Sequence, residues 1–304
     1  MRFNESCDSM KTSKLVRALT RDGSALIVAA DTSRIVQTAH EIHDLSKTMT
    51  AALGRALTAA SMMGSLLKEE KQSVTLRFCG DGPAGTICCV SDWRGNVRGY
   101  ADHPEAELPP NDKGKLDVGG AVGRGPMHVL RDLGLEQPYV GVAQIVSGEI
   151  AEDVTNYFAS SEQTPSVCAL GVLVNKDLTC RAAGGFLVQL LPFADEQTTA
   201  KIEENISKIQ SVSRMVDSGM TPQDMMAVVF DGIEFDILDE AEIDYVCTCS
   251  RERYAKALLS LGKKELQKLI DEGEPVETCC GFCGKKYVFE LDEIRQMLRN
   301  AKKA

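Results

Sequence analysis

The segments Cys247-Thr248-Cys249 and Cys280-Gly281-Phe282-Cys283 decide how the C-terminal part of this chain can fold. Thirty residues separate the two cysteine pairs, which is enough chain to fold back and bring four thiolates together. Four sulfur ligands in tetrahedral geometry suit Zn²⁺. The sulfurs of Cys-x-Cys are also close enough to form a disulfide once a metal has left. The sequence therefore predicts a zinc site, and it leaves open whether the same thiols also act as a redox switch.

The other seven cysteines are interpreted differently. Cys279 could replace Cys280 as a ligand, but Cys-x-x-x-Cys does not form the usual zinc knuckle, so Cys280 is favoured. The remaining six lie in or beside apolar segments of the N-terminal part, where a buried free thiol acts as a small hydrophobic side chain. These six are Cys7, Cys79, Cys88, Cys89, Cys168 and Cys180.

The segment around the cysteine pairs, residues 241–304, is a candidate small domain. Ser250 is placed to cap a helix that runs to Leu261, and a second helix is expected over Lys263–Asp271. After the Cys-x-x-Cys turn, a strand over Lys286–Glu290 and a helix over Asp292–Asn300 are expected. About 60 residues form too small a core for robust stability, so a bound metal would supply what the core lacks.

Charge and composition exclude several classes of protein. The 304 residues exceed the size of most single cores, and the hydrophobic fraction of 43% argues against general disorder. The formal net charge of −10 argues against a protein that binds nucleic acid through a basic surface. Residues 241–304 hold twelve of the 34 Lys/Arg and eleven of the 44 Asp/Glu, so this part is nearly neutral and the remaining 22 and 33 make the rest acidic.

The N-terminal residues show no signal-peptide pattern, and the most apolar stretch, Thr50–Leu67, is interrupted by Arg55. We therefore expect a cytoplasmic protein with no membrane association, in which close cysteine pairs bind metal or undergo redox reactions.

Residues 1–192 are predicted to form an α+β domain on antiparallel sheet, because short turns separate most of the strands. The predicted strands are 14–20, 24–30, 73–79, 86–92, 97–100, 127–130, 139–146, 167–175 and 178–191, and the predicted helices are 32–43, 47–68 and 149–161.

Residues 193–240 are predicted to form a helical linker with little stability of its own. Apolar residues at three- and four-residue spacing predict one helix over Ala194–Val216, and Thr221-Pro222 starts another. Gly232–Tyr245 then alternates apolar with acidic residues and leads directly into Cys247. Such a segment can fold against another surface but buries little by itself.

Other sequence motifs lack the surrounding pattern that their usual functions require. Gly80-Asp81-Gly82-Pro83-Ala84-Gly85 matches GxGxxG, but a β-branched strand follows instead of a helix, which indicates a hairpin turn. The histidines of His40-Glu41-Ile42-His43 are three residues apart, whereas a zincin motif places them four apart. There is no GxxxxGK[ST] motif for ATP, and no catalytic constellation emerges, so an enzyme is not expected.

The combined motifs resemble the bacterial 33 kDa chaperonin family, a family of redox-regulated heat-shock holdases, and the resemblance covers nearly the whole chain. In the C-terminal part it rests on the two cysteine segments with Ser250-Arg251-Glu252-Arg253, Gly284, Tyr287 and Phe289. In the N-terminal part it rests on Arg17-Ala18, Gly80-Asp81-Gly82-Pro83, Tyr139-Val140-Gly141, Gly148-Glu149-Ile150-Ala151-Glu152-Asp153, Tyr157-Phe158 and Ser161-Glu162-Gln163-Thr164-Pro165-Ser166.

The resemblance implies an ATP-independent chaperone that prevents aggregation of unfolding client proteins. It implies an inactive reduced form with one Zn²⁺ on Cys247, Cys249, Cys280 and Cys283. Oxidation would form the disulfides Cys247–Cys249 and Cys280–Cys283, release zinc, unfold the linker and give an active homodimer. Cys279 and the six N-terminal cysteines depart from the simplest family pattern and provide routes to other disulfides.

Two other classes of function compete with this hypothesis. A zinc-ribbon regulator that binds nucleic acid would need a basic surface, which the charge distribution does not favour. A thiol–disulfide oxidoreductase would need its Cys-x-x-Cys in a βαβ context, whereas here this motif is paired with a second dithiol.

Overall fold

The computed structural model describes residues 11–300 and divides into two compact units, Met1–Val246 and Cys247–Ala304. The first unit contains two five-stranded sheets in which all paired strands are antiparallel, so the predicted α+β class is confirmed. The strands of one sheet are, in spatial order, β10 (Phe235–Ile243), β1 (Ser13–Thr20), β2 (Ala25–Asp31), β9 (Cys180–Leu190) and β8 (Ser166–Val174). Those of the other are β5 (Val97–Ala101), β4 (Thr86–Asp92), β3 (Ser73–Cys79), β6 (Pro126–Asp132) and β7 (Tyr139–Gln144).

Helix α2 (Lys47–Gly64) lies between the two sheets and contacts strands of both. Its Ala-, Met- and Leu-rich sequence makes it buried on nearly every face, and Ser46 caps it by accepting a hydrogen bond from the Met49 N–H. Around it lies the main core. The helices α1 (Ser33–His43), α3 (Val118–Val122) and α4 (Ala151–Ser160) complete this layer.

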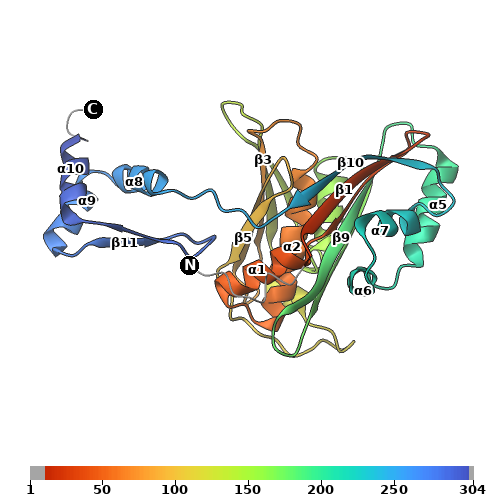
Figure 1. Cartoon of the computed structure of the whole chain (residues 1–304), viewed down its shortest axis with the longest axis horizontal. Helices are drawn as coiled ribbons and strands as arrows, with labels where there is room; N and C mark the ends of the chain where they lie inside the picture. The colour runs from red at the N-terminus through yellow and green to blue at the C-terminus, as the bar shows by residue number, and fades with distance from the viewer. Residues whose placement is uncertain (1–10, 301–304) are drawn as a thin grey trace. The chain divides into compact units, whose positions relative to one another are not determined.

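The opposite face of the β1–β2–β9 sheet is covered by α5 (Glu196–Ser207), α6 (Val212–Asp217) and α7 (Pro222–Val229) (Figure 1). A second apolar cluster lies here, with Val16, Ile27 and Phe186 from the sheet against Met226 and Phe230 from the helical segment. The predicted linker is thus folded and packed in this structure, with β10 beside β1.

The prediction of one helix over Ala194–Val216 was wrong, because the chain breaks at Lys208–Ser211 between α5 and α6. The Ser211 side chain accepts a hydrogen bond from the Arg214 N–H and so starts a new helix.

The segment Gly232–Tyr245, in which apolar and acidic residues alternate, contains strand β10. The contacts at the end of this strand explain where the two units divide. Ile243 pairs with Ser13, and the Tyr245 hydroxyl donates to the Gly99 carbonyl at 2.8 Å. Residues 241–246 therefore group with the first unit, whereas the predicted border is at residue 241.

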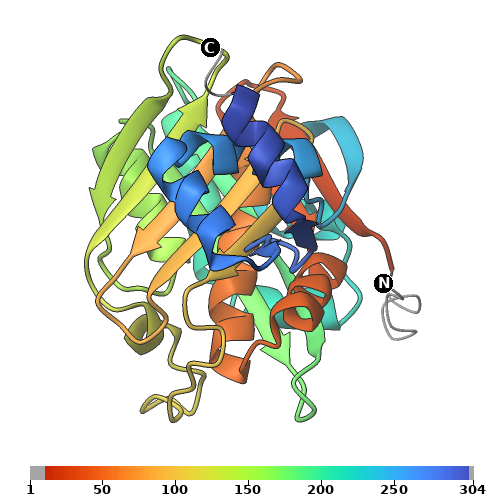
Figure 2. The same ribbon diagram turned by 90° about the vertical axis from the view of Figure 1, so that its left-hand side faces the viewer.

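The second unit, called the cysteine unit below, has a small core of its own. It consists of α8 (Arg251–Ser260), α9 (Lys263–Glu272), the hairpin β11 (Val276–Cys279) and β12 (Lys286–Phe289), and α10 (Leu291–Asn300). Its helices lie beside one another in Figure 2. The six buried residues of its core are Leu258, Leu266, Tyr287, Phe289, Ile294 and Leu298. Strand β11 was not among the predicted elements. Within residues 11–300, no helix is both long and apolar enough to cross a membrane.

Candidate metal centre

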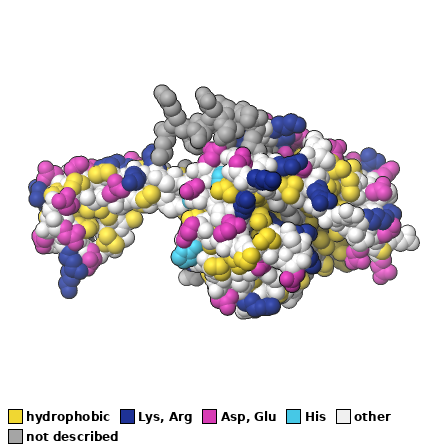
Figure 3. Space-filling model, turned by 90° about the horizontal axis from the view of Figure 1, so that it is seen from below, with side chains coloured by type: hydrophobic (Ala, Val, Ile, Leu, Met, Phe, Trp, Pro, Cys, Tyr) yellow, Lys and Arg dark blue, Asp and Glu magenta, His cyan; other side chains and the backbone are white. Residues whose placement is uncertain are grey.

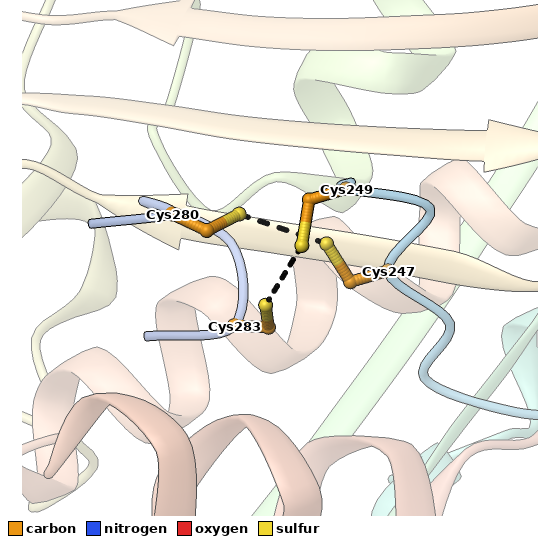
Figure 4. A group of neighbouring side chains, drawn as sticks. All are labelled: Cys247, Cys249, Cys280 and Cys283. Atoms are coloured by element: carbon orange, nitrogen blue, oxygen red, sulfur yellow. Dashed lines mark hydrogen bonds between the residues drawn. The ribbon is translucent and has the colours of Figure 1, made fainter. Parts of the chain in front are cut away.

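Two short segments present the four cysteines of the sequence motif to one point (Figure 4). Cys247 and Cys249 come from the extended chain before α8, where Ser250 caps the helix through a hydrogen bond from the Arg253 N–H. Cys280 and Cys283 come from the turn that joins β11 to β12. The turn closes because the Gly284 N–H donates to the Cys280 carbonyl at 2.8 Å, and Gly284 adopts a φ of 67° that suits glycine.

The sulfur positions fit a zinc ion. All four Sγ atoms lie within 4.8 Å of one another, with Cys247 and Cys280 separated by 3.7 Å and Cys249 and Cys283 by 3.5 Å. A tetrahedral Zn–S₄ site with bonds of about 2.3 Å has sulfurs about 3.8 Å apart. The four close cysteines could therefore hold a metal ion, and an all-thiolate donor set is consistent with zinc.

Cys279 lies outside this cluster although it is adjacent to Cys280. Side chains alternate between the faces of a strand, and Cys279 is the last residue of β11, so its thiol points away and is exposed. Its sulfur donates to the Gly284 carbonyl at 3.5 Å.

Protons are held unequally by the four thiols. Burial raises the pKa of Cys247 and of Cys283, and the neighbouring thiols contribute to the rise at Cys283. Burial also acts on Cys280, but hydrogen bonds from the Tyr254 hydroxyl and from the Phe282 and Cys283 N–H groups outweigh it and lower the pKa of Cys280 to about 6. The metal-free site therefore contains an acidic thiol beside thiols that keep their protons at neutral pH.

Two tyrosines complete the site, and one was not foreseen from the sequence. Tyr254 and Tyr287 stack with ring centroids 4.9 Å apart, and the Tyr287 hydroxyl lies 3.1 Å from the Cys249 sulfur. Tyr254 is one turn beyond the cap residue Ser250 in α8. This spacing is the signal in the sequence that places its hydroxyl near the cysteines.

Most of the remaining cysteines are buried in the first unit. Cys88, Cys89, Cys168 and Cys180 are buried, Cys79 is half-buried, and Cys7 lies outside the described residues. Burial raises the pKa of Cys168 and of Cys180 to about 12, so both stay protonated thiols. This agrees with the prediction that they act as small hydrophobic side chains.

The other sequence motifs have structural roles. Gly80–Gly85 forms the turn between β3 and β4, as predicted. The His43 Nε2 lies 3.0 Å from the Gly99 carbonyl, and the His40 Nδ1 lies 3.4 Å from the Thr50 hydroxyl. The distal Cys-x-x-Cys lies in a hairpin turn and has no βαβ context, which does not favour an oxidoreductase.

Fold and site together define a class: a two-unit α+β protein whose small C-terminal unit contains four thiols that could hold a metal ion. The Hsp33 protein family matches residues 13–290. The chain is 45% identical to the 33 kDa chaperonin of Lachnoclostridium phytofermentans, over 93% of this chain and 97% of the relative, and 46% identical to that of Clostridioides difficile, over 94% and 98%. The crystal structure of the 33 kDa chaperonin from Thermotoga maritima superposes with a TM-score of 0.89 at 37% identity, covering 97% of this chain and all of that one. The chain belongs to the Hsp33 family, and this membership supports a chaperone function.

Proposed function

We propose that this chain is a redox-regulated, ATP-independent holdase that binds unfolding proteins and prevents their aggregation during oxidative and heat stress. The reduced form holds one Zn²⁺ on Cys247, Cys249, Cys280 and Cys283 and is inactive. The oxidised form lacks zinc, is a homodimer and binds clients in the cytoplasm. The observation that carries the proposal is the group of four sulfurs within 4.8 Å of one another in a chain of this family.

The switch is an oxidation of thiols that peroxide can drive. A cysteine thiolate attacks one oxygen of hydrogen peroxide, the O–O bond breaks, and the sulfur becomes a sulfenic acid. A neighbouring thiol then displaces water and forms the disulfide. Each disulfide thus forms as two cysteine sulfurs lose two electrons to one peroxide, which takes up two protons and leaves as two waters. The pairs Cys247–Cys249 and Cys280–Cys283 are proposed from the family resemblance.

The small core of the cysteine unit supports a stabilising role for the metal. Among its described residues only the six of its apolar core and Cys280 are buried, and α8 and α9 expose most of their length. When bound, zinc cross-links the segment before α8 to the turn between β11 and β12 and so stabilises the fold. Oxidation removes the thiolate ligands and with them this cross-link.

Release of the linker would expose an apolar surface for clients. The helices α5–α7 cover Val16, Ala18, Ile27, Phe186 and Val188 of the sheet. This helical segment and β10 immediately precede the cysteine unit, and β10 ends four residues before Cys247. We infer that loss of zinc destabilises the segment and uncovers this face, which then holds apolar parts of unfolding chains.

The proposal is tested by light scattering of a thermally unfolding client without ATP, with the reduced zinc form and with the peroxide-treated form. We expect suppression of aggregation by the oxidised form alone, and reversal by a thiol reductant. Equal suppression by both forms would refute redox control.

Nucleic-acid binding, which the alternative function would require, is measured in parallel by gel shift. On the face shown in Figure 3, Lys and Arg side chains lie among Asp and Glu side chains and not in one continuous basic area, so no shift is expected.

A further inference from the structure

Strand β10 is attached to the edge strand β1 by a ladder of opposite charges. Lys14 Nζ lies 2.7 Å from Glu240 Oε1, and Arg17 forms a two-pronged ion pair with Asp239. Arg21 reaches two carboxylates, those of Glu234 and Asp236, each at 3.1 Å. Basic side chains of β1 and of Arg21 just after it therefore pair with acidic side chains of β10 and of Glu234 just before it.

The middle of this attachment depends little on apolar burial. At the ends of β10, Phe235 packs against the second apolar cluster and Ile243 is buried, but Ile237 and Leu238 between them are 52% and 53% exposed. The register shifts opposite Arg17 and Ala18, where Leu238 is left out of the pairing. Backbone hydrogen bonds and exposed ion pairs thus hold most of the strand. Exposed ion pairs contribute little individually and are weakened by salt, so β10 is well suited to detach.

We propose that the edge of β1 is itself a client-binding site, and that β10 occupies it in the inactive protein as an internal stand-in for a client. The ligand class is an extended polypeptide segment in which acidic residues are interspersed with apolar ones, so that carboxylates emerge on both faces, as they do in β10. Such a segment would add to the sheet through main-chain hydrogen bonds, and Lys14, Arg17 and Arg21 would select for its carboxylates. The inference rests on the proposed function for the release of β10 by oxidation.

The chemistry of the edge supports this choice of ligand. A free edge strand offers unpaired N–H and C=O groups to any extended chain, so the pairing tolerates many sequences. Lys14 and Arg17 lie three residues apart in β1, so their side chains emerge on opposite faces of the sheet, and Arg21 follows in the turn between β1 and β2. A ligand with carboxylates on both faces, as in β10, satisfies all three cations.

A peptide with the sequence of residues 233–244 tests the inference, with fluorescence anisotropy as the readout. We expect it to bind the oxidised, zinc-free chain at least about tenfold more tightly than the reduced zinc form. An isosteric peptide with Asn for each Asp and Gln for each Glu should bind the oxidised chain about tenfold more weakly. Salt should weaken the acidic peptide more than the amide peptide.

A double variant, Asp239→Lys with Glu240→Lys, separates this inference from the proposed function. It sets like charges against Arg17 and Lys14, so β10 should detach while zinc stays bound, which hydrogen exchange of residues 235–243 reports. The reduced variant should then bind the acidic peptide without oxidation. The matched control is Glu70→Lys with Glu203→Lys, which makes the same change in net charge at exposed positions elsewhere and should behave as the unchanged chain.

Each other outcome overturns the inference. If β10 stays protected in the double variant, charge does not hold it. If β10 is released and the peptide does not bind, or both peptides bind equally, the edge does not select acidic segments. If β10 of the oxidised chain is protected in a dimer that excludes the peptide, the edge takes a second copy of this strand instead of a client. An oxidised chain that suppresses aggregation but fails these tests would leave the proposed function intact.

Discussion

Cys247, Cys280 and Cys283 of the candidate metal centre differ in how firmly each holds its proton. Hydrogen bonds from Tyr254 and the backbone of the turn lower the pKa of Cys280, whereas burial raises those of Cys247 and Cys283. Zinc must displace the protons that remain, because thiolate is the form that binds metal. The proton affinities of single residues therefore set how zinc binding depends on pH.

Zinc binding to the reduced chain should strengthen as pH rises. At pH 7 Cys280, with its pKa of about 6, is mostly ionised, and at least Cys247 and Cys283 must each release a proton. The affinity should rise by at least about 100-fold per pH unit near pH 7, and more steeply below pH 6, where Cys280 is also protonated. Competition with a chelator at pH 5.5, 6.5 and 7.5 measures this. An affinity that does not change over this range would contradict the assignment.

Cys279 and Cys280 provide a matched pair of adjacent residues. Cys280→Ser should reduce zinc below one equivalent and weaken the cysteine unit, because its sulfur belongs to the cluster. Cys279→Ser should retain one zinc, because its thiol is exposed and points away, and a surface change of this kind costs within about 0.5 kcal/mol. The zinc content of both purified variants shows which of the two cysteines is the ligand. Zinc loss in the Cys279 variant alone would reverse the assignment.

Among the elements, the helical segment α5–α7 controls access to the apolar face of the sheet. Phe230 is buried at the end of α7 and contacts Phe235 with ring centroids 5.5 Å apart. Asn205 of α5 donates to the carbonyls of Val229 and Asp231 and so ties α5 to the end of α7. These contacts hold the segment together and on the sheet.

Phe230→Ala should loosen this segment. Removal of a buried phenylalanine costs about 3–5 kcal/mol, so amides of residues 196–243 should exchange faster and the reduced protein should gain part of the chaperone activity. Val228→Ala is the control, because Val228 lies in the same helix but is exposed. Hydrogen exchange and client light scattering check both variants. Faster exchange without any activity would show that this face does not bind clients.

Local patterns determined which elements could be predicted from the sequence. The strands of both sheets except β10 were foreseen, as was the cap at Ser46, because alternation, short turns and capping act between neighbours in sequence. The break at Lys208–Ser211 was missed, because the apolar spacing continues through it and the serine cap overrides that spacing. Strand β11 depends on contacts across the cysteine unit, which spacing alone does not reveal, whereas the position of Tyr254 was missed although its spacing from Ser250 indicates it.

The four cysteines of the cluster follow directly from their spacing, since two close pairs can meet at one point. The α+β class, predicted from the pattern of strands and helices, is confirmed by the structure and by the match to a solved Hsp33 structure. The pairing of β10 with β1 was not predicted. It joins residues more than 200 positions apart, and the acidic alternation of β10 indicated only a segment that folds against another surface.

Considered as a whole, the molecule combines a large unit with an extensive core and a small unit with a minimal one. Removal of zinc from the reduced chain by a chelator should therefore unfold the small unit selectively. Amides of α8–α10 should lose protection from hydrogen exchange, whereas those of β3 and β4 should keep it. Uniform protection after chelation would show that the metal does not stabilise the cysteine unit.

The most direct test of the redox switch follows zinc release, thiol loss and suppression of client aggregation in one peroxide-treated sample at elevated temperature. We predict that one zinc per chain is released as four thiols are lost, that peptide mapping finds Cys247–Cys249 and Cys280–Cys283, and that suppression rises with the fraction of zinc released. Zinc that stays bound while aggregation is suppressed, or zinc that leaves with no gain in suppression, would contradict the account.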